Sequence, residues 1–365
     1  MAREQLGVGI IGANVDQGWG TRAHLPALTA MPEFHVAAVC TRHAETAQAT
    51  ADKYGIPQAF TSPEELAASP DVDIVSICVR VPGHRDLVAA ALNAGKHVYC
   101  EWPLGANSRE AKEMRDLAEA KNVRHMVGLQ SRGAPAVGYL KQLVADGYVG
   151  QVVSCSIVSS LPGAGTKSDA FAWSVDAELG ANTLTIPGGH SIDALCYVLG
   201  EFREVSGKVT TQMTTATNVD TGEELRVTAP DQMLVSGILE SGATASVHIS
   251  NVPAHGTGLH WEIHGTEGSL IASAGGAVQY ASITIRGGKR GGTGFEELPV
   301  PAQLRRVPAG VPEGPPLNVG QMFARLAQGI RDGSPVDPDF EVAVTRHRLL
   351  DAITAASDTG RTQTL

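Results

Sequence analysis

The sequence predicts an α/β protein of two domains. An N-terminal Rossmann domain with a doubly wound parallel sheet is expected before an α+β domain with an open, mostly antiparallel sheet. Three observations support this. The chain of 365 residues is too long for one ordinary hydrophobic core. Its first third alternates short apolar runs with helical patterns, as parallel sheets do. After about Gly150, longer strand-like runs follow one another with few helices between them.

Buried strands of the first domain are predicted where continuous apolar runs end at glycine or cysteine. Helices are predicted between them, where apolar residues recur at helical spacing and glycine or proline ends the pattern. The predicted strands are 6–11, 34–40, 73–79, 97–100 and 124–128, and the predicted helices are 23–31, 45–54, 86–94 and 108–121.

The second domain is predicted to contain longer strands, two internal helices and one long loop. A last helix, 341–357, is expected to pack back onto the first domain, which gives domain boundaries of 1–128, 129–340 and 341–365. A sheet with one face free of helices predicts a homodimer or homotetramer. The predicted strands are 152–158, 203–211, 233–240, 244–250, 260–265 and 277–285, the helices are 190–199 and 319–332, and the loop is 287–316.

Composition excludes several functional classes. A net charge of −10 without a basic stripe argues against nucleic acid and against anionic membrane surfaces. The apolar runs are strand-sized, so no membrane span is expected, and the start from Met1 to Gln5 has no secretory leader pattern. Five scattered cysteines without a CxxC pair predict a reduced, cytoplasmic protein. None of the 12 histidines has metal-ligand spacing, so no metal is expected.

A glycine-rich turn follows the first predicted strand, from Gly12 to Gly20. Such a turn lets backbone N–H groups and a helix N-terminus meet a pyrophosphate, so it predicts a dinucleotide site. The loop departs from the usual GxGxxG spacing, since Asn14 stands at the second glycine and extra residues precede Gly20. A plain turn without a ligand is the alternative interpretation.

The end of the second strand selects the cofactor. An acidic residue there would accept from the ribose of NAD, whereas segment 40–43 (CTRH) has none. Thr41 offers a hydroxyl and Arg42 a bidentate partner for a 2′-phosphate, which favours NADP(H) over NAD(H). The alternative for Arg42 is a solvated surface arginine.

Several motifs in this order resemble the Gfo/Idh/MocA family, which contains sugar and polyol dehydrogenases. Within it, the chain is most similar to the branch of the fungal galactose-regulon repressor, a dinucleotide-binding regulator. The family motifs are Gly12 and His84 after apolar strands, 94–103 (AGKHVYCEWP), 128–132 (GLQSR), 147–150 (GYVG) and 188–193 (GGHSID). The branch motifs are 18–19 (GW), 23–26 (AHLP), 101–102 (EW), 129–132 (LQSR), 230–232 (PDQ) and 263–268 (IHGTEG).

The resemblance also implies which residues meet the cofactor and the substrate. Besides Thr41 and Arg42, the expected cofactor contacts are Gly12, Asn14, Trp19, Gly20, Val79, His84, Glu101, Trp102 and Gln130. The expected substrate contacts are Trp102, Arg132, Lys167 and His190.

The chain departs from the dehydrogenase pattern at two positions. Trp102 replaces the lysine of the family's Glu-Lys-Pro motif, and Ile186 stands where an aspartate commonly precedes the histidine. His190 remains as the candidate acid/base, because an imidazole titrates near neutral pH, although a packed histidine at a helix start is the alternative. Asp193 is expected either to orient His190 or to favour the helix N-terminus.

These residues predict an NAD(P)-dependent oxidoreductase for a sugar, polyol or related hydroxy or keto compound. The alternative is a dinucleotide-binding regulator without catalysis, and a lyase that recycles its cofactor is left open. Lys167, Asp169 and Asp176 lie in a polar segment that either roofs the substrate or is a solvated loop.

Overall fold

The computed structural model describes residues 5–15 and 18–365. The prediction that Met1–Gln5 lacks a secretory leader pattern concerns residues of which only Gln5 is described. The chain forms two compact units, one made of residues 1–133 and 305–345 and the other of residues 134–304 and 346–365. Among the described helices, none is both long and apolar enough to cross a membrane.

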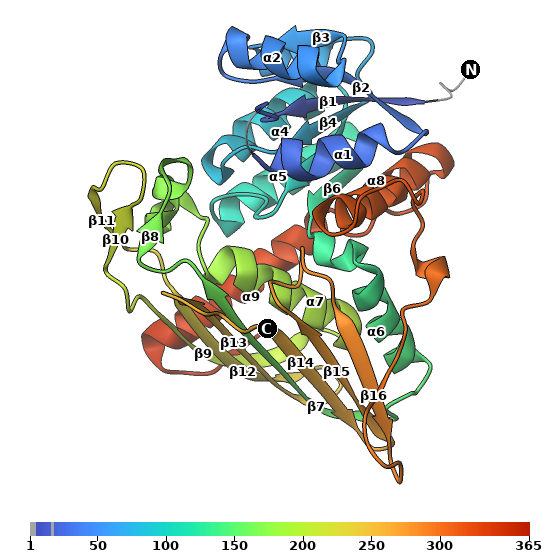
Figure 1. Cartoon of the computed structure of the whole chain (residues 1–365), viewed down its shortest axis with the longest axis vertical. Helices are drawn as coiled ribbons and strands as arrows, with labels where there is room; N and C mark the ends of the chain where they lie inside the picture. Colours follow the sequence, from blue (N-terminus) through green and yellow to red (C-terminus); the bar gives the residue numbers. More distant parts are fainter. Residues whose placement is uncertain (1–4, 16–17) are drawn as a thin grey trace. The chain divides into compact units, whose positions relative to one another are not determined.

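The first unit contains a six-stranded sheet with the strand order β3-β2-β1-β4-β5-β6. Every neighbouring pair is parallel, which confirms the predicted doubly wound sheet (Figure 1). Its strands are β1 (Leu6–Ile11), β2 (Phe34–Cys40), β3 (Gln58–Phe60), β4 (Ile74–Ile77), β5 (His97–Glu101) and β6 (His125–Gly128). Its helices are η1 (Gly20–His24), α1 (Leu25–Thr29), α2 (Ala44–Tyr54), α3 (Pro63–Ala68), η2 (Val81–Gly83), α4 (His84–Asn93), α5 (Ser108–Lys121), η3 (Gln130–Gly133) and α8 (Pro315–Asp332).

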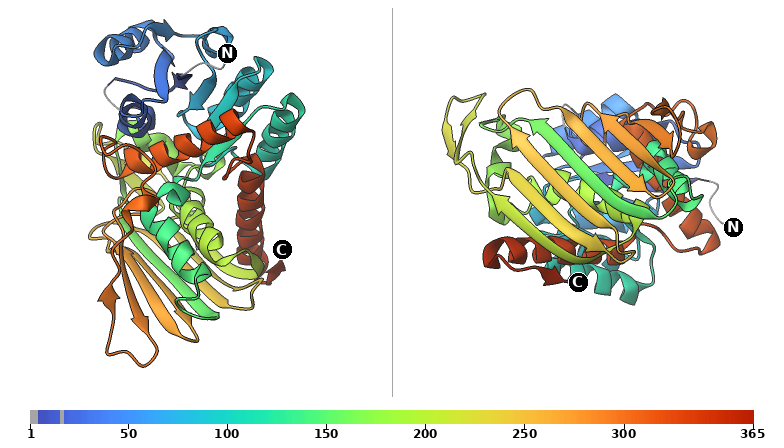
Figure 2. Two further views of the ribbon diagram at one scale, coloured as in Figure 1. Left: turned by 90° about the vertical axis from the view of Figure 1, so that its right-hand side faces the viewer. Right: turned by 90° about the horizontal axis from the view of Figure 1, so that it is seen from below.

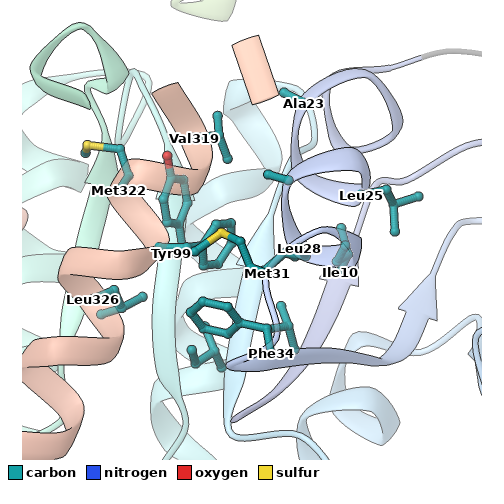
Figure 3. Packing of buried hydrophobic residues seen from close by; sticks show 14 of the residues in the cluster. Ile10, Ala23, Leu25, Leu28, Met31, Phe34, Tyr99, Val319, Met322 and Leu326 are labelled. Atoms are coloured by element: carbon teal, nitrogen blue, oxygen red, sulfur yellow. The ribbon is translucent and has the colours of Figure 1, made fainter. Parts of the chain in front are cut away.

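Helices cover both faces of this sheet because side chains alternate along each strand. Ile10 of β1 belongs to the hydrophobic cluster of α1 and α8. On the opposite face, a Cβ on Gly9 would lie 2.7 Å from Leu66 of α3, so only glycine lets this helix approach the strand. The cluster is shown in Figure 3, where Met31, Phe34 and residues of α8 converge.

The division of the chain differs from the predicted boundaries at α8. This helix was expected in the second domain, but Val319, Met322 and Phe323 are buried in the cluster of the first unit. Gln321 also donates to the carbonyl of Gly133 over 3.1 Å. The apolar stripe of α8 completes a core whose other residues lie almost 300 positions earlier in the chain. Hydrophobic periodicity predicts the helix but not the elements against which it packs.

The second unit is built on a nine-stranded sheet with the order β17-β16-β15-β14-β7-β13-β12-β9-β18. All its neighbours are antiparallel except β7 and β13, which confirms a mostly antiparallel sheet. A separate small sheet has the strand order β11-β10-β8, and its strands fall between β7 and β12 in the sequence. The strands are β7 (Val152–Pro162), β8 (Thr166–Lys167), β9 (Phe202–Thr210), β10 (Thr215–Asn218), β11 (Glu224–Arg226), β12 (Gln232–Leu239), β13 (Thr244–Val252), β14 (Gly258–Gly265), β15 (Gly268–Ala274), β16 (Thr284–Lys289), β17 (Glu296–Glu297) and β18 (Gln363–Thr364).

The helices of the second unit cover one face of the large sheet, and its other face is open in Figure 2. On that open face Leu234 is exposed, whereas its strand neighbours Met233 and Val235 are buried. The final helix differs from its expected position, because from Arg346 onward it belongs to this unit and Ser357 bonds to Val209 of β9. The helices are α6 (Pro135–Ala145), η4 (Asp169–Val175), η5 (Ala177–Leu179), η6 (Leu184–Gly188), α7 (Gly189–Leu199), η7 (Ala302–Leu304) and α9 (Phe340–Thr359), of which α9 begins in the first unit.

One predicted strand is wrong, and the predicted long loop is interrupted by short elements. Segment 277–285 was predicted as a strand, but a turn occupies its beginning and β16 starts only at Thr284. The preceding strand β15 was missed because it is rich in glycine, serine and alanine, which have low strand propensity. The predicted loop 287–316 contains the end of β16, all of β17 and the short helix η7.

Candidate functional site

The turn after β1 requires glycine at its first position. Gly12 has φ +98°, and a Cβ there would lie 2.7 Å from the carbonyl oxygen of Cys78 and 2.8 Å from Val79. Its N–H donates to the carbonyl of Cys40 over 2.9 Å. Gly12 therefore holds the turn against the carboxyl ends of β2 and β4, which is where Rossmann sheets bind ligands.

The rest of this loop is held by α2. Thr50 donates to the carbonyl of Ala13 over 3.1 Å, and the ammonium of Lys53 donates to the carbonyl of Val15 over 3.2 Å. The predicted loop residues Asp16 and Gln17 lie outside the described part of the chain. The hydroxyl of Thr21 donates to the carbonyl of Asn14, which ties the loop to the start of η1.

The loop has the features that a dinucleotide pyrophosphate requires. Gly20 begins η1, and a Cβ there would approach Ala13 to 3.2 Å, so the backbone is close-packed at the helix start. The buried indole Nε1 of Trp19 has no hydrogen-bond partner among the described residues. A close backbone, a helix N-terminus and a buried donor fit a phosphate-bearing cofactor.

The end of β2 presents a cation and no carboxylate. Thr41 bonds to the carbonyl of His43 and, over 2.6 Å, to the hydroxyl of Thr46. Arg42 is exposed, and its guanidinium has no ion-pair partner among the described residues. A free guanidinium here is available to a phosphate.

His84 fixes the segment that carries Trp102. Its Nδ1 lies 2.9 Å from the carbonyl oxygen of Pro103, and its Nε2 lies 3.1 Å from that of Val79. Burial lowers the pKa of His84. The Trp102–Pro103 peptide bond is cis, and the indole of Trp102 is only 5% exposed. The His84 ring therefore links the segment after β4 to the segment after β5.

Glu101, the last residue of β5, is held by a histidine that the sequence analysis did not single out as a site residue. His24 Nε2 lies 2.8 Å from a Glu101 carboxylate oxygen, and His24 Nδ1 lies 2.9 Å from the hydroxyl of Ser76. Burial alone would lower the pKa of His24, but the neighbouring Cys78 and Glu101 raise it to about 10. His24 is thus an imidazolium paired with a carboxylate inside the first unit.

The short helix η3 carries two more predicted site residues. Gln130 is 2% exposed, and its Oε1 has no hydrogen-bond partner among the described residues. Arg132, predicted to bind substrate, donates to Asp337 over 2.6 Å, and its carbonyl accepts from Arg325 over 2.7 Å. The guanidinium of Arg132 is therefore engaged in holding η3 against the segment after α8.

His190 lies at the start of α7 in the second unit and is 3% exposed. Burial lowers its pKa to about 4, against the opposing influence of Asp193. Its Nδ1 is buried and has no hydrogen-bond partner among the described residues. Asp193 pairs with Arg346 of α9 over 3.5 Å, so its charge is shared with that arginine.

A cavity of about 300 Å³ lies in the second unit between the large sheet and segment 161–187. Lys167 is one of its wall residues and donates to the carbonyl of Gly163 over 3.2 Å. Burial lowers the pKa of Lys167. Ile186, at the position expected from the family pattern to be acidic, also lines this cavity.

The other two polar residues predicted near the substrate serve the fold. Asp169 accepts from Asn218 over 3.2 Å, and its own N–H donates to Asp220. Asp176 accepts from the N–H of Glu178 and caps η5. Among the described residues no group of three histidine, cysteine or acidic side chains is arranged to hold a metal ion.

Two family profiles match the chain in succession. Residues 6–129 match the oxidoreductase family with an NAD-binding Rossmann fold, Gfo/Idh/MocA. Residues 135–274 match the C-terminal domain of Gal80p, a regulatory protein of galactose and lactose metabolism in yeasts. The dehydrogenase AclE of Aspergillus oryzae is 31% identical over 287 residues, which cover 73% of this chain and 76% of AclE. The chain belongs to the Gfo/Idh/MocA oxidoreductase family.

Further comparisons agree with this membership. Levoglucosan dehydrogenase of Pseudarthrobacter phenanthrenivorans is 28% identical over 291 residues, covering 73% of each chain. The crystal structure of an NAD-binding oxidoreductase from Klebsiella pneumoniae superposes with a TM-score of 0.85 at 25% identity, covering 99% of both chains.

The structure of this Gfo/Idh/MocA protein also contains residues that sequence reasoning missed. Phe171, Trp173, Asn251 and Tyr280 all line the cavity with Lys167. Two aromatic residues within one polar segment of the sequence were the available signal for Phe171 and Trp173. Asn251 lies at the end of β13, and only the fold brings it to this wall.

Proposed function

We propose that this protein is an NADP(H)-dependent oxidoreductase acting on a sugar, polyol or related hydroxy or keto compound, with His190 as the proton acceptor. The observation that carries this proposal is that His190 is buried while its Nδ1 has no hydrogen-bond partner among the described residues. A buried imidazole without a partner on Nδ1 lowers the stability of the fold, so its presence favours a functional role.

The first unit supplies the cofactor site in this proposal. Gly12, Asn14, Trp19 and Gly20 form the turn that would hold the pyrophosphate, and Val79, Glu101, Trp102 and Gln130 would line the path of the nicotinamide half. Thr41 and Arg42 would hold the 2′-phosphate, which favours NADP(H) over NAD(H). His84 would keep the Trp102–Pro103 segment in place through its two carbonyl contacts.

The second unit supplies the proton chemistry. A nicotinamide held by the first unit would supply the hydride acceptor for oxidation of a hydroxyl-bearing carbon, and the hydroxyl proton would go to a base on the protein. Burial keeps the imidazole of His190 neutral at pH 7, so its nitrogen lone pair is available to take that proton. Lys167 would donate to the substrate oxygen, and Trp102 would contribute shape rather than a proton.

Dinucleotide binding is the first test. The purified protein is titrated with NADPH and with NADH while energy transfer from tryptophan is followed. Arg42→Ala is expected to weaken NADPH binding about tenfold or more and to leave NADH binding unchanged, because only the phosphate contact is lost. Arg203→Ala, a change at an exposed arginine of β9, is the matched control. Equal affinity of wild type and Arg42→Ala for NADPH would overturn the cofactor preference.

Turnover is the second test. His190→Gln is expected to lower kcat by about 10²–10⁴-fold without changing NADPH affinity, since a positioned base contributes about that much. A variant that retains wild-type kcat would remove His190 from the mechanism.

A second candidate function is a dinucleotide-binding regulator without catalysis. It is favoured by the match of residues 135–274 to the Gal80p C-terminal domain and by the buried tryptophan at position 102. Tight NADPH binding together with no turnover of any hydroxy or keto compound, in wild type as in His190→Gln, would favour this function.

We also propose a homodimer or homotetramer that uses the open face of the nine-stranded sheet, in a reducing cytoplasm where the five buried cysteines stay free. Light scattering of wild type and of Leu234→Lys, a charge on that face, tests the assembly. A monomeric wild type would contradict it.

A further inference from the structure

The cavity of the second unit has an aromatic and aliphatic wall. Phe171, Trp173 and Tyr280 contribute aromatic side chains to it, and Ile186, Pro187 and Met213 contribute aliphatic ones. Phe171 is 62% exposed although it forms part of this wall. An exposed phenylalanine beside an apolar cavity is the arrangement expected where a ligand supplies the missing cover.

Several polar groups at this wall are already used by the fold. Asp231 accepts from the backbone N–H groups of Gln212 and Met213 at 2.7–3.0 Å. Asn182 accepts from the N–H groups of Leu184 and Thr185. These carboxylate and amide oxygens stabilise the loops around the cavity, so they have little remaining capacity for the hydroxyl groups of a ligand.

Two other polar groups of this wall keep hydrogen-bonding capacity for a ligand. The buried Oδ1 of Asn251 has no hydrogen-bond partner among the described residues and is an acceptor. The Lys167 ammonium is a donor, and the carbonyl of Gly163 takes only one of its three hydrogens. A hydroxyl group of the ligand can accept from Lys167, and a hydroxyl group can donate to Asn251, so this wall serves one or two hydroxyls.

Backbone hydrogen bonds to the chain after β11 hold the segment that carries the aromatic residues. None of the residues of η4 is buried, although the helix includes Phe171 and Trp173. Val175 at its end accepts from the N–H groups of Thr228 and Ala229, both over 2.9 Å. The helix is therefore positioned by the chain around β11 and leaves its aromatic side chains to the cavity.

We propose that this cavity binds the substrate and that the substrate is a ring alcohol, or the matching ketone, with few hydroxyl groups. The proposal rests on the oxidoreductase function proposed above and narrows its substrate class. A fully hydroxylated ring would bring several hydroxyls against apolar walls. Each hydroxyl left without a partner weakens binding about tenfold. A volume of about 300 Å³ is at the small end of the range for such sites and suits one or two rings.

Two matched probes test this directly. The full chain is titrated by calorimetry with trans-1,2-cyclohexanediol and with myo-inositol, which share a six-membered carbon ring and differ in the number of hydroxyls. The diol is expected to bind at least about tenfold more tightly than myo-inositol. The proposal is overturned if myo-inositol binds as tightly as the diol, or if neither probe binds at millimolar concentrations.

Variants at the wall locate the binding. Phe171→Ser and Trp173→Ala are each expected to weaken diol binding about tenfold, and Ile186→Asp is expected to reverse the preference between the probes. Phe171 is largely exposed, so its change cannot be dismissed as a folding defect. Val219→Ser, at an apolar residue that is 61% exposed and does not line the cavity, is the control. Diol binding that is unchanged in both aromatic variants would refute the assignment of this cavity.

This inference and the proposed function can fail separately. Binding of the diol without its oxidation by NADP⁺ would leave the cavity assignment standing and contradict the enzyme. Oxidation of myo-inositol, but not of the diol, would support the enzyme and contradict the substrate class.

Discussion

His24 in the first unit and His190 in the second are both buried, at 0% and 3% exposure, yet their rings are in opposite states. Both nitrogens of His24 have partners, Glu101 and Ser76, and its pKa is raised to about 10. The Nδ1 of His190 has none among the described residues, and its pKa is lowered to about 4. Burial is common to both, so the partners decide the charge.

The difference separates a structural histidine from a candidate functional one. A ring with both nitrogens bonded stabilises the fold and has no capacity left for a substrate. A neutral ring with an unused nitrogen costs stability and keeps that capacity. Four measurements test this distinction.

The largest expected effect is at the carboxylate partner of His24. Glu101→Gln leaves the buried imidazolium without its counter-charge, so we expect the free energy of unfolding to fall by about 3–5 kcal/mol. Denaturant unfolding at pH 7 measures it. A loss under about 1 kcal/mol would mean that the pair is not charged in the folded protein.

The next effect is a pH dependence caused by His190. Folded His190 stays neutral down to about pH 4, whereas the unfolded chain protonates it below about 6.5. The unfolded state therefore binds more protons in this window, and stability is lost as the pH falls from 6.5 towards 4. Wild type should lose about 3 kcal/mol more than His190→Gln over that range. Parallel stability profiles for the two proteins would contradict the lowered pKa.

A smaller effect is expected at the other nitrogen of His24. Ser76→Ala removes a neutral acceptor from Nδ1 while the ion pair with Glu101 remains. We expect the unfolding free energy to fall by about 1–2 kcal/mol, the usual cost of one unsatisfied buried donor. If Ser76→Ala lowered the unfolding free energy as much as Glu101→Gln, the Ser76 hydroxyl would stabilise His24 as strongly as the Glu101 carboxylate does.

The smallest effect is expected at a histidine pair on the protein surface. Glu262 lies 3.0 Å from His260 and 3.3 Å from His264, and both rings are well exposed. Glu262→Gln should change the unfolding free energy by less than about 1 kcal/mol. A larger change would show that this face is covered in solution.

Local patterns predicted much of the fold. The bounds of β1, β2 and α5 coincide with the predicted segments, because each is a single run with a clear end signal. Strand β15 was missed because its small residues carry a weak pattern, and α8 was assigned to the wrong domain because its partners are distant in sequence.

The candidate site could be predicted only in part for the same reason. Gly12, Arg42 and His84 could be singled out because each lies in the connection after a predicted strand, and their roles as site residues stay predictions. The pair of His24 and Glu101 joins residues 77 positions apart, and the cavity wall joins η4 to the end of β13. Neither contact has a local signature, so both depend on the tertiary structure.

The first unit is discontinuous, and this affects its biogenesis. When residues 1–133 have left the ribosome, all six strands of the parallel sheet exist but α8 does not. Leu28, Met31 and Phe34 therefore lack their covering residues until residues 134–304 of the second unit and α8 up to Leu326 have been synthesised. At about 5–20 residues per second this takes roughly 10–40 s. We therefore expect the nascent N-terminal half to expose apolar surface, and truncation before α8 should yield an aggregating fragment rather than a free Rossmann domain.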